Sequence, residues 1–442
     1  MSEDLKPDTL PPQAQAAWNY PLFDAIMGRR TRRFGLGMEM ANGPFRYRSD
    51  KEAVPLDSLE TAMLVAAATA TTGPILAETE YPGGMVKTIG KPYASAMGSH
   101  RARLFFTDDS GVYIVKSDQA AMTKMQEYAD ASDRSKIQGF YDSCVHKLQD
   151  GRMVLPPKEP GLWPHNHWNC NRPGTTLFMP VIDTSKDLIK IILNLSDSKA
   201  GRYAKDGGYY LVDDRHGMRP CGNQKWVDSG LLNKNKVMTL SRLEALLAAG
   251  MQAEGSFMGQ LLHLAAQAIG VGGWLFGGFS STVVMGGTPI TKGLGFRFIQ
   301  AKSDPFPIPV GIPGMFEGYC PPFFPTMDDA VDAALSGVTM TMDQWEAKGM
   351  FKPHKADNEA FDAATPQASP EGIACTKDIC RYIYETYGKF PGTTDTMQLL
   401  LMFQAHHLDL DFYDQHMQAG AYGETHRNHF RDWHAGQEPQ EK

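Results

Sequence analysis

Apolar residues at positions 22, 23, 26 and 27 fall on one face of a helix and precede Gly28, a residue typical of helix ends. This spacing predicts a short helix over 22–27. A second helix is expected from Asp57, because Asp57 and Glu60 have the separation of a capping box, in which each side chain accepts the backbone N–H of the other residue. The alanine-rich run to Ala70 permits close packing, so we expect this helix in the core.

A long region of helical periodicity lies in the second half of the chain. Ser241 and Glu244 again have capping-box spacing, and they open a predicted helix that continues to position 251. A separate helix is predicted over 257–269. The glycine-rich stretch 270–279 follows it, which indicates a tight turn after the helix.

Strand-like patterns alternate with these helices. Residues 101–116 place Asp-Asp-Ser-Gly between two runs rich in β-forming residues, which predicts a hairpin. Further strands are expected at 188–195 and 294–299, and a helix over about 120–141. The mixture of helices and short strands predicts the α+β class.

The remaining third of the chain combines prolines with a helical pattern. Prolines between 300 and 325 enforce an extended path, which we expect to wrap over a surface. From Met327 the pattern is helical again and includes the strongly apolar segment 397–410. Asp409, Asp411 and Asp414 alternate with apolar residues there, and we expect them on an exposed helix face.

These patterns suggest five consecutive regions. An N-terminal arm over 1–19 precedes the first part of a core over 20–116, an inserted region over 117–238, a second core part with the wrapping segment over 239–325, and a helical C-terminal extension over 326–442. No internal repeat is apparent in the inserted region.

Composition narrows the class of protein. Of the 442 residues, 42% are hydrophobic and 21% are charged, which is ordinary globular usage. The net charge of -7 argues against general nucleic-acid binding, which needs a broad basic field. The stretch 261–279 is long enough to raise a membrane span, but it contains His263, Gln267 and five glycines, so we expect no span. Six cysteines without a CxxC pair and an N-terminus without a signal sequence favour the cytoplasm.

The densest cationic cluster is Arg29-Arg30-Thr31-Arg32-Arg33. Guanidinium groups bind phosphate through paired charge-assisted hydrogen bonds, and a threonine hydroxyl can add another. The cluster is therefore a candidate site for a phosphorylated ligand. A solvated basic face is the alternative, because charge runs are usually exposed.

At this cluster the chain resembles the nitroreductase-like flavoprotein superfamily, whose members begin with a short helix and an Arg-Arg-Ser-x-Arg signature. Arg29, Arg30, Thr31 and Arg33 match that signature, with the aromatic Phe34 one residue early. The capped, alanine-rich helix ending at Thr72-Gly73 also follows the order of the family. A second match lies far downstream, where the helix over 265–270 leads into Phe276-Gly277-Gly278-Phe279.

The resemblance implies an FMN-dependent oxidoreductase with a mixed sheet flanked by helices. It also implies a domain-swapped homodimer with flavin at the subunit interface. Arg29, Arg30, Thr31 and Arg33 would bind the flavin, and a backbone amide at the Gly277-Gly278 turn, that of Gly277, would face flavin N5. No Gly-x-Gly-x-x-Gly follows a strand and opens a helix, so NAD(P)H would stack on the flavin as a transient donor. The substrate would be an electron-poor small molecule, such as a nitro, quinone, enone or halogenated compound.

The chain also departs from the family pattern. The Ser-x-x-Asn-x-Gln-Pro segment after the second helix is absent, and Thr71-Thr72-Gly73-Pro74 is nearest to it. Lys292 and Arg297 are the candidates for the late basic residues of the family. In some relatives an insertion covers the flavin as a lid. Residues 117–238 contain an aromatic, proline-rich loop that suits this role, and Trp163, His165, Trp168 and Phe276 are the substrate-side candidates.

Two groups of histidines contain candidate metal ligands. His165-x-His167-x-x-Cys170 has suitable residue types for zinc but no visible fourth ligand. A metal-dependent hydrolase using it, or a non-catalytic protein of the flavin fold, is the alternative function. His406, His407, His416, His426, His429 and His434 form a looser collection. Adjacent histidines on a helix point about 100° apart, so we expect no metal there.

Overall fold

The computed structural model describes residues 10–74, 89–96, 98–117, 137–198, 206–302, 304–336, 341–347, 355–364, 368–435 and 439–442. A seven-stranded sheet lies at the centre, and all its neighbouring strands pair antiparallel. Its main path runs in the order β12, β17, β8, β5, β6, β7, with β16 also paired to β8. The bounds are β5 (Ala102–Thr107), β6 (Gly111–Val115), β7 (Val145–Asp150), β8 (Thr176–Asp183), β12 (Gly272–Phe276), β16 (Met397–Gln398) and β17 (Met402–His406).

Strand β8 is buried along its whole length, because both faces of the sheet are covered. Its alternate residues enter two different hydrophobic clusters, as strand geometry requires. Leu177 and Met179 pack in one cluster, whereas Phe178 and Ile182 pack in the other. The α+β class predicted from the sequence is confirmed.

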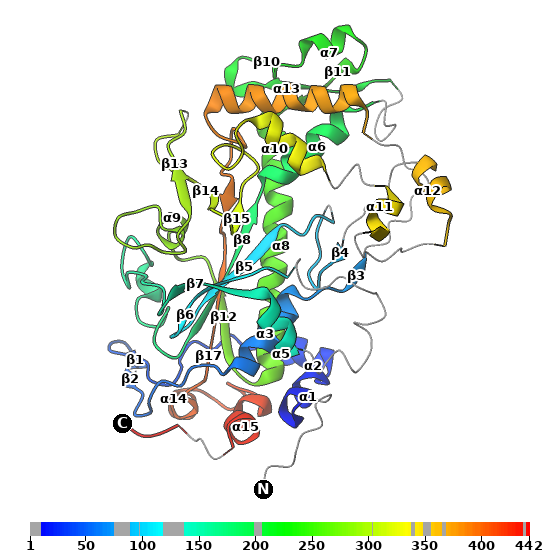
Figure 1. Ribbon diagram of the computed structural model, residues 1–442. Helices are drawn as coiled ribbons and strands as arrows, with labels where there is room; N and C mark the ends of the chain where they lie inside the picture. Colours follow the sequence, from blue (N-terminus) through cyan, green and yellow to red (C-terminus); the bar gives the residue numbers. More distant parts are fainter. Residues whose placement is uncertain are drawn as a thin grey trace.

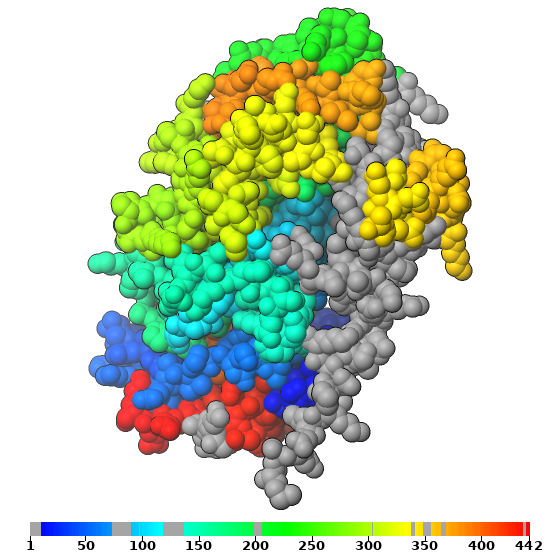
Figure 2. All heavy atoms as spheres, in the orientation of Figure 1, coloured from blue at the N-terminus to red at the C-terminus, as the bar shows by residue number. Residues whose placement is uncertain are grey.

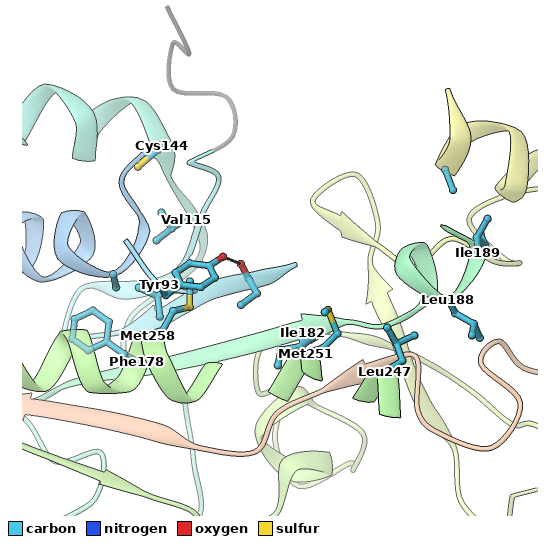
Figure 3. Packing of buried hydrophobic residues seen from close by; sticks show 14 of the residues in the cluster. Tyr93, Val115, Cys144, Phe178, Ile182, Leu188, Ile189, Leu247, Met251 and Met258 are labelled. Atoms are coloured by element: carbon cyan, nitrogen blue, oxygen red, sulfur yellow. Dashed lines mark hydrogen bonds between the residues drawn. The ribbon is translucent and has the colours of Figure 1, made fainter. Parts of the chain in front are cut away.

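Helix α8 (Leu240–Ile269) spans the sheet as one continuous helix of 30 residues, about 45 Å long (Figure 1). We predicted two helices here, which is wrong. Two glycines of the helix face the sheet: an added Cβ would lie 3.5 Å from Pro180 at Gly255 and 2.6 Å from Leu275 at Gly259. They allow close packing without breaking the helix. Figure 3 shows Met251 and Met258 of α8 over Ile182 and Phe178 of β8.

The ends of the predicted helices are partly confirmed. Helix α2 (Leu22–Gly28) and the hairpin β5–β6 form as expected. Helix α3 (Ser58–Thr69) begins with the predicted capping box of Asp57 and Glu60. The second predicted box is wrong, because α8 begins at Leu240 after Thr239, and Glu244 instead accepts the backbone N–H of Gly392.

Residues 188–195 form part of helix α6 (Ser185–Ser196), so the predicted strand there is wrong. Leu188, Ile189, Ile192 and Leu193 are buried and recur at helical spacing, which a short apolar run does not distinguish from a strand. Helix α6 packs against α13 (Pro370–Tyr387) and α10 (Met327–Leu335). A small sheet of β9 (Gly208–Asp213), β10 (Arg219–Pro220) and β11 (Leu232–Thr239) lies beside them and holds a parallel pair, β9 with β11 (Figure 1).

The helix predicted over residues 397–410 is also wrong, because this segment contains two strands. These strands are β16 and β17, and β17 is an inner strand of the sheet, between the edge strand β12 and β8. Asp409 is not on an exposed helix face. It is fully buried and its carboxylate caps the N-terminus of α14 (Leu410–His416).

Every region predicted from the sequence, apart from the N-terminal arm, supplies strands to the central sheet. Residues 117–238 contribute β7 and β8, and residues 326–442 contribute β16 and β17. Of the helix predicted over 120–141, residues 120–136 lie outside the described ranges, and α5 (Ile137–Cys144) covers its end. The proline-containing segment forms a second small sheet of β13 (Arg297–Ile299), β14 (Ile308–Ile312) and β15 (Phe316–Glu317).

The first and last helices lie at the same end of the molecule. Helices α1 (Pro12–Trp18) and α2 contact α8, and so does α15 (Glu424–Trp433) (Figure 1). In the space-filling view the C-terminal residues lie directly against N-terminal residues (Figure 2).

The other elements are β1 (Glu39–Met40), β2 (Tyr47–Arg48), β3 (Gly73–Pro74), β4 (Ile89–Gly90), α7 (Gln224–Asp228), α9 (Ser281–Met285), α11 (Met342–Ala347) and α12 (Asn358–Ala364). None of the helices in the described ranges has both the length and the apolarity that crossing a membrane requires.

Candidate functional site

The arginine segment 29–33 lies along the end of α8 and the first half of β12. Arg32 donates its backbone N–H to the carbonyl of Gly273 at 3.2 Å. His263 of α8 fixes the segment from the other side. Its Nδ1 lies 3.1 Å from a guanidinium nitrogen of Arg29, and its Nε2 lies 3.0 Å from the carbonyl of Arg30. The guanidinium can only donate and the carbonyl can only accept, so His263 is the neutral Nε2–H tautomer.

The arginine side chains of the segment take different directions. The guanidinium of Arg30 donates to the carbonyls of Met27 and Arg29, and Arg32 Nε donates to the carbonyl of Ala421. The Arg33 guanidinium lies over the Trp274 ring, 4.6 Å from its centre. Trp274 in turn stacks on Phe276, with 3.9 Å between ring centres. Arg33, Trp274 and Phe276 therefore contact one another in order along β12, toward the carboxyl end of the strand.

The Gly277-Gly278 turn at that end packs against the loop that contains Trp163 and His165. The carbonyl of Gly278 accepts the backbone N–H of Trp163 at 3.1 Å and the side-chain amide of Asn166 at 3.2 Å. An added Cβ at Gly278 would lie 2.7 Å from His165 Nε2 and would have to displace this side chain. Gly277 is exposed, and the nearest atoms to a Cβ there are 3.5 Å away.

The predicted substrate-side residues are only partly brought together. Trp163 and His165 lie with ring centres 6.4 Å apart beside the Gly278 turn, which follows Phe276 directly. Trp168 lies elsewhere and stacks on Phe34 at 5.9 Å. Of the two candidates for late basic residues, Arg297 is on β13, paired with Gly311, and Lys292 lies in the loop before that strand.

The His165, His167 and Cys170 side chains do not converge. His165 is exposed, whereas His167 Nε2 lies 2.8 Å from the carbonyl of Leu162. Cys170 is buried in the hydrophobic cluster on one face of the sheet, and burial raises the pKa of its thiol. These contacts favour packing over metal binding at this motif.

A different group of metal-binding residues does converge. Glu60, His407, His429 and His434 each offer one ligand atom, and these four atoms lie within 4.8 Å of one another. The Nε2 atoms of His407 and His434 are each 3.0 Å from Glu60 Oε1, and that of His429 is 2.7 Å away. The side chains are 0–8% exposed. This cluster, called the Glu60 cluster below, was not predicted from the sequence.

Three distant segments build the Glu60 cluster. Glu60 occupies the first turn of α3, His407 directly follows β17, and His429 and His434 lie on α15 and just after it. The prediction that His406 and His407 are helical neighbours is wrong, since β17 is a strand and its end directs His407 toward α3. The sequence signal that could have identified the site is the carboxylate at Glu60, which we interpreted only as a helix cap.

The cluster also shifts the ionisation of its members. Burial opposes the charge of Glu60, but the neighbouring imidazoles of His407, His429 and His434 hold its pKa well below the usual range. Burial lowers the pKa of His429. The hydrogen bond with Glu60 raises that of His434. The carboxylate is therefore ionised in this buried position.

A separate cavity of about 380 Å³ lies between β5, β8, the start of α6 and the β14–β15 turn. Its charged lining residues are Arg101, Arg103, Lys116, Asp183, Lys186 and Glu317. Several are engaged within the chain: Arg101 Nε donates to Asp187 at 3.1 Å, and Lys186 Nζ donates to the Tyr319 hydroxyl at 2.8 Å. None of the residues predicted to bind flavin or substrate lines this cavity.

Comparison with known proteins gives little beyond this geometry. No family model matches the chain, and no curated protein matches it. One solved structure that matches is a protein from Ralstonia eutropha provisionally named a nitroreductase, with 11% sequence identity and a TM-score of 0.26. The match covers 59% of this chain and 71% of that one. At such a score, no conclusion about fold or activity rests on the likeness.

Proposed function

We propose that the protein is an FMN-dependent oxidoreductase that passes electrons to an electron-poor small organic molecule. One observation carries the proposal. The two sequence blocks that resemble the nitroreductase-like flavoproteins are more than 200 residues apart in the chain, yet they lie side by side, joined by the hydrogen bond from Arg32 to Gly273. A chance resemblance in two separate blocks gives no reason for them to share one site.

The residues of the segment fit an anionic cofactor. Arg29, Thr31 and Arg33 are exposed, and an arginine has five N–H donors, so the contacts of Arg29 with His263 and of Arg33 with Trp274 leave donors for a phosphate. Arg30 turns toward carbonyls of its own helix end and would support the segment. In this assignment Arg29, Arg30, Thr31 and Arg33 hold the cofactor.

The glycine turn fits the other end of a flat cofactor. Gly277 follows Trp274 by three residues, roughly 10 Å along a strand. Without a Cβ, the exposed backbone at Gly277 can approach a ring closely and offer its N–H. Bound FMN would supply the electron transfer through its N5 atom, with NAD(P)H as the transient donor. The Gly277 amide would tune that step, while Gly278 holds the loop with Trp163 and His165 beside the ring.

Homodimer formation is part of the proposal, and the surface of α2 supports it. Leu22, Phe23 and Met27 are 63%, 72% and 74% exposed on the described chain. This apolar surface directly precedes the arginine segment, so a second subunit covering it would lie beside the cofactor. Burial of exposed apolar side chains favours such association. Light scattering at low micromolar concentration should give the mass of a dimer, and Phe23→Glu combined with Met27→Glu should shift it toward the monomer.

The cofactor assignment is tested by binding. The purified protein should be yellow or bind added FMN, and Arg33→Ala should weaken FMN binding about tenfold or more, because a charge-assisted hydrogen bond contributes about 1.5–3 kcal/mol. Arg48→Ala is the matched control, since Arg48 is exposed and lies on β2 outside the segment. Failure of the folded wild-type protein to bind FMN would refute the proposal.

Activity separates the proposal from a non-catalytic flavin-binding protein. The FMN-loaded protein should oxidise NAD(P)H when a nitro compound or a quinone is present. Stoichiometric FMN with no turnover on any such acceptor would favour the non-catalytic alternative. The side chains of His165, His167 and Cys170 do not converge on one point, so they do not support the alternative of a metal-dependent hydrolase.

A further inference from the structure

We propose that the Glu60 cluster binds one divalent transition-metal ion, of the Zn²⁺ class, as a structural clamp between the C-terminal helix α15 and the core. The four candidate ligands are one carboxylate and three imidazoles, with no thiolate. Zn²⁺ accepts nitrogen and oxygen donors and prefers four of them in a tetrahedral arrangement. The number and type of donors therefore match.

The orientation of two histidines suits metal ligands. His407 Nδ1 lies 2.9 Å from the carbonyl of Val54, and His429 Nδ1 lies 3.0 Å from the carbonyl of Ile269. A carbonyl can only accept, so each Nδ1 carries a proton. Both Nε2 atoms face Glu60. Each of them either carries a second proton, as in a cationic imidazolium, or presents a lone pair that a metal ion would bind. Metal-binding histidines are typically oriented in this way, by a backbone carbonyl at the other ring nitrogen.

The number of contacts at Glu60 Oε1 points in the same direction. Three imidazole nitrogens approach this one oxygen within 3.0 Å, whereas a carboxylate oxygen has about two lone-pair sites. His429 Nε2 is the nearest, yet this buried nitrogen has no hydrogen-bond partner of acceptable geometry. A cation placed among the four atoms would bind the three imidazole nitrogens and the carboxylate at once.

Binding would require a rearrangement of the four ligand atoms around the ion. Zn–N and Zn–O distances near 2.0–2.1 Å correspond to roughly 3.3 Å between neighbouring ligands of a tetrahedron. The present distances from Glu60 Oε1 to the three nitrogens are 2.7–3.0 Å, and all four atoms lie within 4.8 Å of one another. The nitrogen–oxygen pairs would therefore separate slightly, and any nitrogen pair near the upper limit would move closer together.

The burial of the cluster decides the role of the ion. The four side chains are 0–8% exposed, and four protein ligands complete the coordination of a tetrahedral ion. No position is left for a substrate or an activated water. The ion would therefore be structural, and it would join α15 to the start of α3 and the end of β17.

Metal content and metal binding test the proposal directly. The full-length protein, purified without chelators, should hold about one Zn²⁺ per chain after gel filtration. After removal of the ion, titration with Co²⁺ should produce the visible absorption of a four-coordinate site. His434→Gln should weaken Zn²⁺ binding at least tenfold, and this position at the end of α15 is the ligand least embedded in the fold.

His426→Gln is the matched control, because His426 is buried on the same helix but outside the cluster, where its Nδ1 accepts the N–H of Gly423. It should retain the metal. A folded wild-type protein that holds no metal and gives no Co²⁺ absorption would overturn the proposal, as would equal loss of metal in both variants. These measurements do not depend on flavin and can be made on flavin-free protein.

Discussion

Glu60 Oε1 lies 3.0 Å from His434 Nε2, although 374 positions separate the two residues in the chain. The other oxygen of the same carboxylate, Oε2, accepts the backbone N–H of Asp57 at 2.6 Å. The Glu60 carboxylate therefore belongs both to the capping box of α3 and to the Glu60 cluster. One oxygen caps α3 and the other faces the imidazoles of the C-terminal region.

These two roles of Glu60 can be separated by mutating its partners. Asp57→Ala removes one side of the capping box and should lower the free energy of unfolding by about 1 kcal/mol, as the loss of an N-cap usually does. Metal content should not change, because Asp57 does not reach the imidazoles. His434→Gln should show the reverse pattern, with the metal lost and α3 still capped. Chemical denaturation and metal analysis of both variants make the comparison; loss of metal in Asp57→Ala would contradict it.

The stability of the protein should fall on acidification partly because of His263. Burial lowers the pKa of His263 below its ordinary value of 6.5, and the nearby charge of Arg29 lowers it further. Above pH 6.5 both folded and unfolded states keep this histidine neutral. Below it, only the unfolded state takes up the proton, so the free energy of unfolding should fall by up to about 1.4 kcal/mol per pH unit.

The substitution His263→Gln should remove this contribution, since glutamine can accept from Arg29 and donate to Arg30 but does not titrate in this range. The measurement is the difference between wild-type and variant unfolding free energies from pH 7 down to about pH 5. His165→Gln is the control, because His165 is exposed. Parallel pH profiles for wild type and His263→Gln would show that His263 carries no such linkage.

Arg32 and Arg33 are neighbours with different expected effects. Arg32 donates to the carbonyl of Ala421, so Arg32→Ala should lower the free energy of unfolding by about 1–2 kcal/mol and leave FMN affinity nearly unchanged. Arg33→Ala should weaken FMN binding with a smaller effect on stability. Thermal unfolding and FMN titration of the two variants provide the test. Equal FMN affinities in both would remove Arg33 from the cofactor site.

The two adjacent glycines should also differ. A Cβ at Gly278 would lie 2.7 Å from both His165 Nε2 and Asn166 Nδ2, so Gly278→Ala should cost about 1–3 kcal/mol of stability. Gly277→Ala should be tolerated, because its nearest neighbours are 3.5 Å away. Similar melting temperatures for the two variants would mean that the loop with His165 does not pack on Gly278.

Proline at Gly277 tests the proposed contact with flavin N5. Gly277→Pro removes the backbone N–H and restricts φ, while Gly277→Ala keeps the N–H. The proline variant should still bind FMN, but its flavin should be reduced more slowly by NAD(P)H or show a shifted reduction potential. If the proline and alanine variants were reduced alike, the amide would not be at N5.

The sequence alone was enough to predict features whose causes are local. The α3 capping box depends on two residues three positions apart, and the β5–β6 hairpin depends on the four-residue turn Asp108–Gly111. Helix α2 ends at its glycine for the same kind of reason. The sequence also identified the arginine segment and the Gly277-Gly278 turn as matching blocks.

Tertiary structure decided whatever depends on the surroundings of a segment. Residues 188–195 and 397–410 are both apolar, and their local patterns did not separate helix from strand; packing on α13 and pairing with β8 did. Residues 241–251 and 257–269 were predicted as two helices, but they form one continuous helix, in which Gly255 and Gly259 pack against the sheet. The Glu60 cluster depends on chain segments that meet only after folding, because no spacing in the sequence relates Glu60 to His407, His429 and His434.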